Sequence, residues 1–438
     1  MRRRLWMKIL VLLIVVLVVA AWYIYVRNQN IIYRKMEQEE VSITLLASKN
    51  WIKDIDRELF DEFERETGIR IQVLLTPNSG YESLVGTCLA GGNGEVDMFM
   101  FPMGTMLSSM GIEDIALNLS QEPWVNRLEG WAREASSCSG KVLGFPTWGL
   151  DYEGILYNKT FFKEHHLEVP GTWKEFLTLC DQIRSLGTVP LYEALNDTWH
   201  TQCWVYGLTP MLYRENPDFV EELNKGSEYK LEDLLCLQKG MEQIQQLFSK
   251  KENGIPKYYV GDGREEEFPG SYSYLTQRKA VMMFTYSAYA SELKDYGSQD
   301  EWGMFPVPLL DNQTAVSNGG GMAKFINKNS EHIEECKQLL YFLAKDENLE
   351  RYYAARKDLV TSAFQGIESV QTPQATREIL RRSKGKTEVM FTKDVFYLDP
   401  KLYQYIQELA DGTAGAQDAI RKLDEYRAKM FHSKDTPR

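Results

Sequence analysis

Residues 144–162, with the sequence GFPTWGLDYEGILYNKTFF, place Trp148, Asp151, Tyr152 and Glu153 within six positions of the chain. A flat aromatic ring packs against the apolar C–H face of a sugar, and a carboxylate accepts hydrogen bonds from the sugar's hydroxyl groups. The stretch therefore has the residue types of a saccharide-binding site. Because alternate residues of a strand share one face, the two acids also leave open a carboxylate pair for glycoside hydrolysis.

Similar residues recur where strands are predicted to end, as at Trp51, Phe101, Tyr286 and Tyr289. Ligands of open α/β sheets bind at the carboxyl ends of the strands, so these positions are candidates for one common site. For any single Trp or Tyr, a place in the core is about as common as a place in a site, and only the joint placement favours binding. The candidate ligand-binding residues are Asn50, Trp51, Phe101, Trp148, Asp151, Tyr152, Asn196, Trp199, Tyr286, Ser287, Tyr289, Asn318, Gly319 and Gly320.

Sequence motifs of common enzymes were sought, and none is complete. There is no H-E-x-x-H, no G-x-S-x-G and no full P-loop, and the glycine clusters at 91–94 and 319–321 do not fit G-x-G-x-x-G. The six cysteines include no C-x-x-C, and there are five histidines, which argues against a zinc site. We expect no catalytic residues, no cofactor and no metal. The thiols should be mainly buried, although one or two disulfides stay open. The net charge of -12 argues against a nucleic-acid partner.

The N-terminus carries the clearest targeting signal. Residues 9–26 are an uninterrupted apolar run of 18 residues, which is about 27 Å long as a helix and close to the thickness of a bilayer core. The basic residues at 2–4 and 8 should stay in the cytoplasm, which places the rest of the chain outside. We expect a retained transmembrane anchor, at about 5–26, followed by a polar stalk to residue 40. A signal peptide cleaved after Ala20 is the competing interpretation.

From residue 41 the chain alternates between strand and helix patterns. VSITLLA and IRIQVLL flank a segment that ends at Gly68 and has apolar residues at helical spacing, and this order predicts a βαβ unit. The apolar helical face consists of Ile52, Ile55, Leu59, Phe60 and Phe63. Thr172 and Glu175 form a capping box for another helix. Further helices are predicted at 232–248, 330–345, 372–382 and 416–431.

A family resemblance rests on a series of segments in a fixed order. They are GGNGEVDMFMF, GKVLGFPTWGLDYEGILYNKTFF, PGTWKEF, LTQRKAVMMF and EWGMFPVPLL. The chain resembles the extracellular solute-binding proteins of carbohydrate ABC transporters, the class that includes the maltose-binding protein. The match runs from about residue 41 to 431. Each segment is weak alone, and the series is fairly specific.

The resemblance implies an α/β fold of the periplasmic-binding-protein type, with two interleaved lobes, a hinge and one N-terminal transmembrane helix before them. Residues 41–153 with 305–362 would form the first lobe, and 154–304 with 363–438 the second. The chain would cross between them near 154–158 and again near 302–308. A ligand in the cleft would close the lobes by a hinge motion.

The resemblance also implies roles for single residues. Asp151 falls where maltose-binding proteins keep a sugar-binding acid, and Trp199 matches an aromatic residue of the second lobe. The sequence departs from the pattern at Val96, where the family has proline, and at TYSAY, residues 285–289, where it has Gly-Ser-Trp. The missing tryptophan puts the ligand class in doubt, although Tyr286 or Tyr289 is available to substitute. No cysteine near the N-terminal segment offers a lipid site, which supports the peptide anchor.

Three functions stay open at this point. The first is a membrane-anchored, monomeric binding protein that delivers a saccharide to ABC permease subunits, and we expect this one. The second is a ligand sensor for a membrane receptor. The third is an extracytoplasmic enzyme that acts on glycosides with Asp151 and either Glu153 or Glu193, and the resemblance makes it the least favoured.

Overall fold

The computed structural model describes most of the chain from residue 41 onward. The described residues are 41–49, 51–77, 81, 84–86, 96–104, 107, 110–249, 251–252, 255–260, 267–319, 321–356, 359–367, 372–390, 395 and 397–434. The predicted anchor and stalk lie outside these residues, as do Asn50 and Gly320. Within the described part, no helix combines the length and apolar character that crossing a membrane requires.

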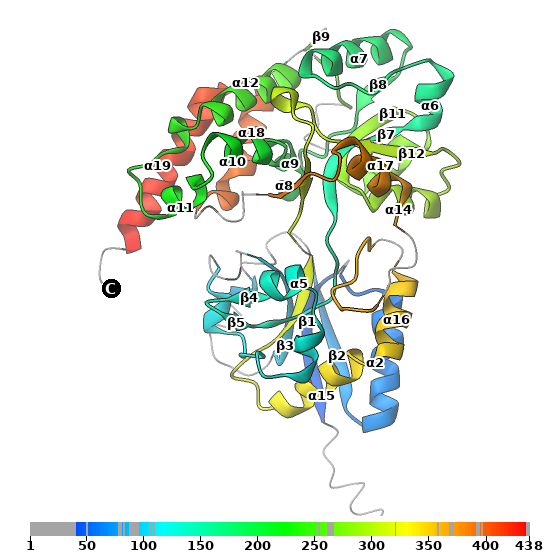
Figure 1. Cartoon of the computed structure of the whole chain (residues 1–438), viewed down its shortest axis with the longest axis vertical. Helices are drawn as coiled ribbons and strands as arrows, with labels where there is room; N and C mark the ends of the chain where they lie inside the picture. Colours follow the sequence, from blue (N-terminus) through cyan, green and yellow to red (C-terminus); the bar gives the residue numbers. More distant parts are fainter. Residues whose placement is uncertain are drawn as a thin grey trace, which may run out of the picture.

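The described chain forms two lobes, each built on its own sheet (Figure 1). The first sheet has the order β2-β1-β3-β14-β6. β1 is parallel to both β2 and β3, and β14 runs antiparallel to β3 and β6. Its strands are β1 (Ser42–Ser48), β2 (Arg70–Thr76), β3 (Met98–Pro102), β6 (Gly144–Pro146) and β14 (Met322–Ile326). The parallel pairing of β1 and β2 around a helix confirms the predicted βαβ unit.

That helix, α2, spans Asp54–Thr67 and has the predicted apolar face, because Ile55, Leu59, Phe60 and Phe63 are all buried. Gly68 ends it with a φ of 77°, a left-handed conformation that glycine adopts without steric cost. The helix packs with α15 (Ile333–Leu343) and α16 (Asp346–Ala355) beside the first sheet. The first lobe also carries α5 (Gly130–Ala135) and a small hairpin of β4 (Ser137–Cys138) and β5 (Lys141–Val142).

The second sheet has the order β15-β13-β7-β11-β8, and β12 also pairs with β7. The central strand β7 (Tyr152–Asn158) runs antiparallel to β11, β12 and β13. Its neighbours are β8 (Val189–Leu191), β11 (Ala280–Tyr286), β12 (Trp302–Phe305), β13 (Ala315–Ser317) and β15 (Thr387–Val389). β12 and β13 follow one another along the same edge of β7, which makes both of them part of the second lobe.

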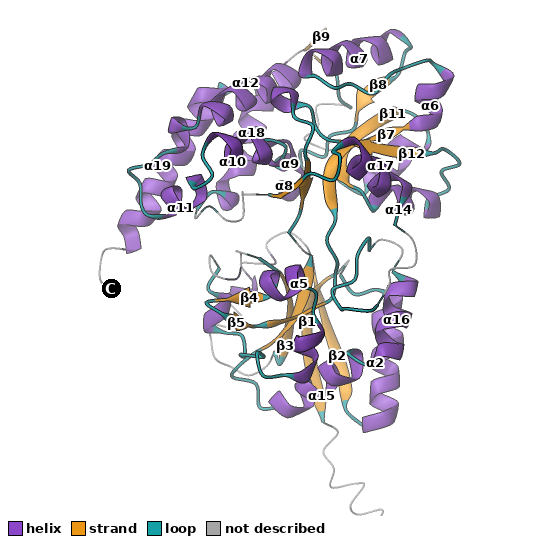
Figure 2. Ribbon diagram, in the orientation of Figure 1, coloured by secondary structure: helices purple, strands orange, loops and turns teal. Residues whose placement is uncertain are grey.

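Helices surround the second sheet and extend beyond it (Figures 1 and 2). The predicted capping box is confirmed, because the hydroxyl of Thr172 accepts a hydrogen bond from the backbone N–H of Glu175 at the start of α7 (Trp173–Ser185). The predicted later helices correspond to α12, α15, α17 and α19. The helices of this lobe are α6 (Lys159–Glu164), α7, α8 (Thr198–Thr201), α9 (Cys203–Tyr206), α10 (Thr209–Glu215), α11 (Phe219–Asn224), α12 (Leu235–Ser249), α13 (Gly270–Thr276), α14 (Tyr289–Asp295), α17 (Gln374–Arg382), α18 (Asp399–Asp411) and α19 (Ala416–Lys434).

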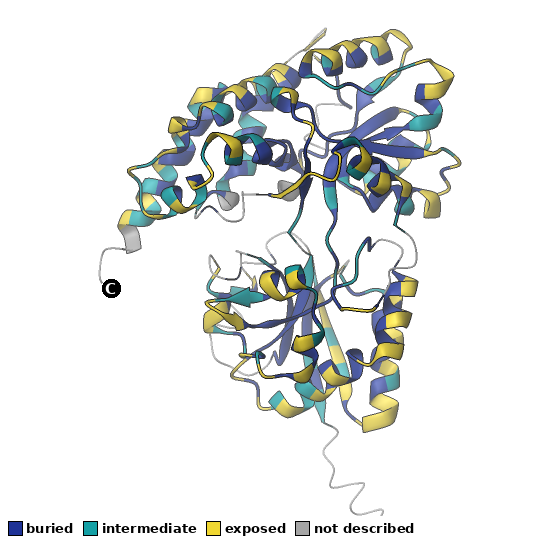
Figure 3. Cartoon of the chain, viewed as in Figure 1, coloured by how far each residue is buried: buried dark blue, intermediate teal, exposed yellow. Residues whose placement is uncertain are grey.

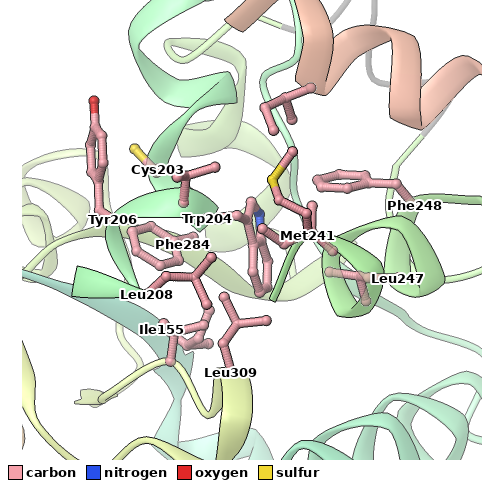
Figure 4. Close-up of a cluster of buried hydrophobic side chains, with 14 of the residues drawn as sticks. Ile155, Cys203, Trp204, Tyr206, Leu208, Met241, Leu247, Phe248, Phe284 and Leu309 are labelled. Atoms are coloured by element: carbon pink, nitrogen blue, oxygen red, sulfur yellow. The ribbon is translucent and has the colours of Figure 1, made fainter. Parts of the chain in front are cut away.

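Apolar side chains fill the interior of each lobe separately. Figure 3 shows most strands as buried, the edge strand β2 as partly exposed, and the outward faces of the helices as exposed. In the second lobe, Trp204, Met241 and Phe284 meet in one cluster between the sheet and the helices (Figure 4). In the first lobe, residues from β1, β3 and α2 share a cluster with α15 and α16. Each lobe therefore has a core of its own, which allows the two to move as units.

Three segments link the lobes, and neither of the two crossings that the resemblance implied lies where it was expected. The chain leaves the first sheet after β6 and enters the second at β7, so residues 147–151 form the first crossing. The return lies at 318–321, between β13 and β14, because β13 pairs with β7 and β15 in the second sheet. The expected crossings at 154–158 and 302–308, and the placement of 305–317 in the first lobe, are therefore wrong. The third crossing leads from α16 to α17.

Candidate functional site at the lobe crossings

The first two crossings are hydrogen-bonded to each other. On the side of the first lobe, the backbone N–H groups of Thr147 and Trp148 donate to the carbonyl of Met322, at 2.9 and 3.2 Å. On the side of the second lobe, the backbone N–H of Asp151 donates to the side-chain oxygen of Asn318, and the N–H of Asn318 donates to the carbonyl of Asp151, both at 3.1 Å. The predicted residues Trp148, Asp151 and Asn318 therefore lie together.

The third crossing joins the first through Thr361. Its hydroxyl accepts a hydrogen bond of 2.8 Å from the backbone N–H of Leu150. Gly149 lies so close that a Cβ atom there would be 2.0 Å from the carbonyl oxygen of Thr361. Only glycine fits this approach without a shift of the backbone, which explains the Trp-Gly-Leu sequence inside the first crossing.

The carboxylate of Asp151 is buried, with 7% of the residue exposed. One oxygen accepts hydrogen bonds from the backbone N–H of Tyr152, at 2.7 Å, and from both the N–H and the hydroxyl of Ser287. The other accepts from the N–H of Ala288 at 3.1 Å, immediately before α14. Burial raises the pKa of Asp151 to about 7, and the four donors oppose that rise. The acid predicted to hold a sugar is thus engaged by protein donors.

Asp151 is connected to α17 through Ser287. The Ser287 hydroxyl, besides donating to Asp151, lies 2.7 Å from the hydroxyl of Thr376 in that helix. Asp151, Ser287 and Thr376 are all buried. The N-terminus of α14, the helix α17 and the first crossing are therefore held in one hydrogen-bonded unit.

Trp148 lies between the first crossing and the first lobe. The guanidinium carbon of Arg356 is 5.1 Å from the centre of a Trp148 ring, which is a cation–π distance. Arg356 is 2% exposed, and its Nη1 donates a 2.6 Å hydrogen bond to the hydroxyl of Tyr352. The indole Nε1 of Trp148 is buried and has no hydrogen-bond acceptor among the described residues. The residue as a whole is half-buried, so the ring is held on one side by Arg356 and keeps some exposed surface.

A buried ion pair lies behind the same crossing and was not foreseen. Lys324 Nζ is 3.0 Å from Asp56 Oδ1 and 3.4 Å from the hydroxyl of Thr147. Both charged side chains are almost fully buried. The sequence signal was a lysine in the apolar strand MAKFI together with an acid in the first turn of α2. The pair anchors the crossing to the first lobe.

In the second lobe, partly exposed aromatic residues lie at the sheet edge that faces the crossings. Tyr286 ends β11 and pairs with Glu153 of β7, while Tyr152 begins β7. Tyr152 and Tyr286 are half-buried, whereas the rest of β11 is buried. Burial raises the pKa of the Tyr152 hydroxyl, and the nearby charge of Asp151 adds to the rise. Tyr286 thus lies at the carboxyl end of its strand, as the sequence predicted, and Tyr152 lies near it at the start of β7.

Several other predicted site residues are interior in this structure. Phe101 is fully buried because β3 is a central strand, with β1 on one side and β14 on the other. Tyr289 is fully buried, and its hydroxyl is hydrogen-bonded to Ser271. Ser287 is fully buried beside Asp151. The expectation that these three contact a ligand is therefore corrected: in this conformation they are packing or hydrogen-bonding residues of the lobes.

The remaining predicted residues are placed less centrally or lie outside the description. The Trp51 ring meets Tyr81 edge-on at 4.6 Å between centroids, and Trp51 is half-buried. Asn196 is exposed and donates a 3.4 Å hydrogen bond to Glu267. The backbone of Trp199 lies in α8, and its side chain is not described. Gly319 has a φ of 70°, in the left-handed region that glycine tolerates.

Two of the three acids considered for glycoside chemistry, Asp151 and Glu193, are buried and hydrogen-bonded to donors of the protein. Glu193 is fully buried and accepts a 3.1 Å hydrogen bond from the indole N–H of Trp204. Burial raises the pKa of Glu193 to about 8 and lowers the pKa of the buried His200 to about 4. Among the described residues, no group of three or more His, Cys, Asp or Glu side chains is arranged to hold a metal ion. Cysteines 138, 180, 203, 236 and 336 are present as thiols, and of these 180, 203 and 336 are buried, as the sequence predicted for most.

The family of the chain follows from a comparison with protein-family models. Residues 58–377 match the model of the bacterial extracellular solute-binding proteins. The chain belongs to this family. The solute-binding protein is thus extracytoplasmic by family, and its relatives in the comparisons are binding proteins rather than enzymes.

Individual relatives are distant in sequence and similar in fold. A multiple sugar-binding protein of Streptococcus mutans is 21% identical over 329 residues, which cover 72% of this chain and 74% of the relative. A sugar transporter of Bacillus licheniformis, solved in complex with stachyose, is 17% identical with a TM-score of 0.70, over 89% of this chain and 100% of that one. The putative binding protein MsmE of Bacillus subtilis, in an open conformation, is 16% identical with a TM-score of 0.67, over 90% and 99%. The solute-binding protein therefore has the two-lobed α/β fold of periplasmic binding proteins.

Proposed function

We propose that this solute-binding protein captures a sugar or oligosaccharide between its two lobes and delivers it to the permease of an ABC transporter. The observation that carries the proposal is the placement of half-buried aromatic rings on both sides of the crossings. Trp148 belongs to the first crossing beside the first lobe, and Tyr152 and Tyr286 lie at the facing edge of the second sheet. Such rings fit the C–H faces of sugars. Similar proteins that bind stachyose and raffinose, or are named for multiple sugars, support the choice of ligand.

The crossings would act as the hinge of a closing motion. Residues 147–151 and 318–321 run together and are tied to the third crossing by Thr361. We assign residues 41–150 with 321–356 and 359–367 to the first lobe, and residues 151–317 with 372–434 to the second. Through its hydrogen bonds, Asp151 would hold the first crossing against the start of α14. Because the backbone N–H of Tyr152 also donates to Asp151, the same contact would orient Tyr152.

The location of the protein is proposed from its N-terminal sequence. The apolar run at 9–26 would remain as an anchor, with the two lobes outside the membrane as a monomer on a short stalk. Intact-mass analysis of protein purified from membranes tests this, because a mature N-terminus at Ala21 would show that the segment is a cleaved signal peptide.

A binding role, rather than an enzymatic one, is supported by the state of the acids. The Asp151 oxygens accept four hydrogen bonds from the protein, and Glu193 is fully buried beside Trp204. Neither carboxylate is placed to protonate or attack a glycosidic bond, which needs two carboxyl groups on either side of the bond. Incubation of the protein with oligosaccharides, followed by product analysis, should return the substrates unchanged.

A thermal-shift screen against neutral mono- and oligosaccharides tests the main proposal. A ligand present at 100 times its dissociation constant adds about 2.7 kcal/mol to the free energy of unfolding, so a true ligand should raise the melting temperature by several degrees. Hits are then titrated by calorimetry. Amino acids and short peptides serve as the comparison set. Stabilisation by peptides and by no saccharide would contradict the proposed ligand class.

A further inference from the structure

Glu292, in α14, holds two tyrosine side chains at once. One of its carboxylate oxygens accepts a 2.8 Å hydrogen bond from the hydroxyl of Tyr286, and the other accepts a 2.6 Å hydrogen bond from the hydroxyl of Tyr272. Charge-assisted hydrogen bonds of this kind are stronger than those between neutral groups. The carboxylate therefore fixes the outer end of Tyr286, the ring that we place beside the ligand.

The ring of Tyr286 is also packed from the sides. Phe268 lies nearly parallel to it, at 6.0 Å between centroids and 21° between planes. Tyr289 meets it edge-on at 5.8 Å. Residues before Tyr286 in β11 are all buried, whereas Tyr286 itself is half-buried. The ring thus has a support behind it and retains exposed surface at the end of the strand.

Tyr272, the other partner of Glu292, belongs to a rigid group. It stacks on Tyr296 with centroids 3.8 Å apart and planes 15° apart, and it packs against Tyr289 at 5.0 Å. The carboxylate is therefore anchored on one side to a packed aromatic cluster while it holds Tyr286 on the other. Glu292 therefore connects the packed side chain of Tyr272 to the ring of Tyr286 at the sheet edge.

We infer that Glu292 is a positioning residue for ligand binding, a role that rests on the proposed function. Its carboxylate accepts the hydrogen bond that the Tyr286 hydroxyl donates, and this bond fixes the ring before the ligand binds. Tyr286 then offers the ligand an apolar face and not a hydrogen-bond donor. The ligand moiety that this face fits is a ring with an apolar C–H surface, such as a pyranose. Because the Tyr286 side chain is already ordered, binding does not lose the conformational entropy of immobilising it, and affinity is higher for that reason.

A double-mutant cycle on ligand affinity tests the inference. With a saccharide from the screen as titrant, Glu292→Ala and Tyr286→Phe should each weaken binding about three- to tenfold, because each breaks the same hydrogen bond. The double variant should bind no more weakly than either single variant, since residues in one contact are not additive. Tyr341→Phe is the matched control: it removes a tyrosine–glutamate hydrogen bond of the first lobe, from Tyr341 to Glu122, and should leave affinity within about twofold.

The outcomes separate the possible roles. Glu292→Ala with wild-type affinity and a lower melting temperature would show that the carboxylate only stabilises the lobe. Additive losses in the double variant would show that Glu292 and Tyr286 act separately, and would overturn the inference as well. If Glu292→Ala does not fold, Glu292→Leu, which keeps much of the side-chain volume and has no acceptor, replaces it in the cycle. Wild-type protein that binds no saccharide would contradict the proposed function, and the inference would fall with it.

Discussion

Asp151 and Ser287 are 136 positions apart in the sequence, and the Asp151 carboxylate accepts hydrogen bonds from both the backbone N–H and the hydroxyl of Ser287. This pair joins the first crossing to the N-terminal end of α14, where a negative charge is favoured by the helix dipole. The residue that the resemblance suggested as a sugar ligand thus links the first crossing to the second lobe. Its effects on stability and on binding can be measured separately.

Asp151→Asn should lower the free energy of unfolding by about 1–3 kcal/mol at pH 5, because an amide NH2 replaces an acceptor and one backbone N–H is left without a partner. Burial raises the folded pKa of Asp151 to about 7, so the wild type loses stability as pH rises toward 7 and the difference should be smaller at pH 8. Urea denaturation at pH 5 and pH 8 without ligand measures both values. Ser287→Ala, which removes one of the four donors, should cost less than Asp151→Asn. Unchanged stability of Asp151→Asn, together with binding weakened tenfold or more, would instead assign the carboxylate to the ligand.

Trp148→Ala should weaken saccharide binding by roughly ten- to several-hundredfold, because it removes an aromatic face that would contact the sugar. A tenfold change in affinity corresponds to about 1.4 kcal/mol of binding free energy. It should also lower the apo melting temperature moderately, because the ring contacts Arg356. Trp148→Phe keeps a flat ring and should restore much of the affinity. Calorimetric titration beside apo melting curves measures both effects. Wild-type affinity in a folded Trp148→Ala variant would remove Trp148 from the site.

Glu193→Gln should change how stability depends on pH. The folded pKa of Glu193 is raised from about 4.5 to about 8, so its favourable contribution is complete below pH 4.5 and is lost as pH rises to 8. Glutamine can still accept the hydrogen bond of Trp204 and has no charge to bury. The variant should therefore gain stability relative to wild type by a few kcal/mol between pH 4.5 and pH 8, measured by chemical denaturation. His200 Nδ1 lies 3.9 Å from the Glu193 carboxylate and has the opposite pH dependence below pH 6.5, so the comparison is made above that pH. Parallel pH profiles would contradict the prediction.

Gly149→Ala should force the first and third crossings apart. Its Cβ would lie 2.0 Å from the carbonyl oxygen of Thr361, and overpacking of this kind costs about 1–3 kcal/mol. Small-angle scattering should show an altered radius of gyration, and melting should occur earlier. Gly130→Ala is the control, because a Cβ at the start of α5 meets no atom within 4 Å. Equal behaviour of the two variants would show that the crossings tolerate separation.

Local patterns in the sequence predicted the helices and the first βαβ unit well. The apolar spacing of α2 and the capping box of α7 are set by neighbouring residues, so they can be read without knowledge of the fold. The family series predicted the two lobes. In the candidate site, Trp148, Asp151 and Asn318 come together as expected, and Tyr152 and Tyr286 lie at the facing sheet edge.

The features that the sequence did not predict depend on contacts between residues that are far apart in the chain. β12 and β13 are both short and apolar, and nothing in either strand indicates that β13 pairs with β7 rather than with the first sheet. The four donors to Asp151 include two residues more than 130 positions away. Phe101 has the same residue type and strand-end position as a site aromatic, and only its place in a central strand makes it a core residue.

The position of β14 in the first sheet determines when that lobe can be completed during synthesis. Among the described strands, β6 pairs only with β14, and β14 also pairs with β3. Residues 144–146 therefore have no strand to join until residues 322–326 have been made, by which time most of the second lobe exists. Ribosomes add residues from the N-terminus at about 5–20 per second, so the early segments wait for many seconds with an open sheet edge. Until then the sheet of the first lobe lacks two of its five strands, and the core beneath it cannot be completed.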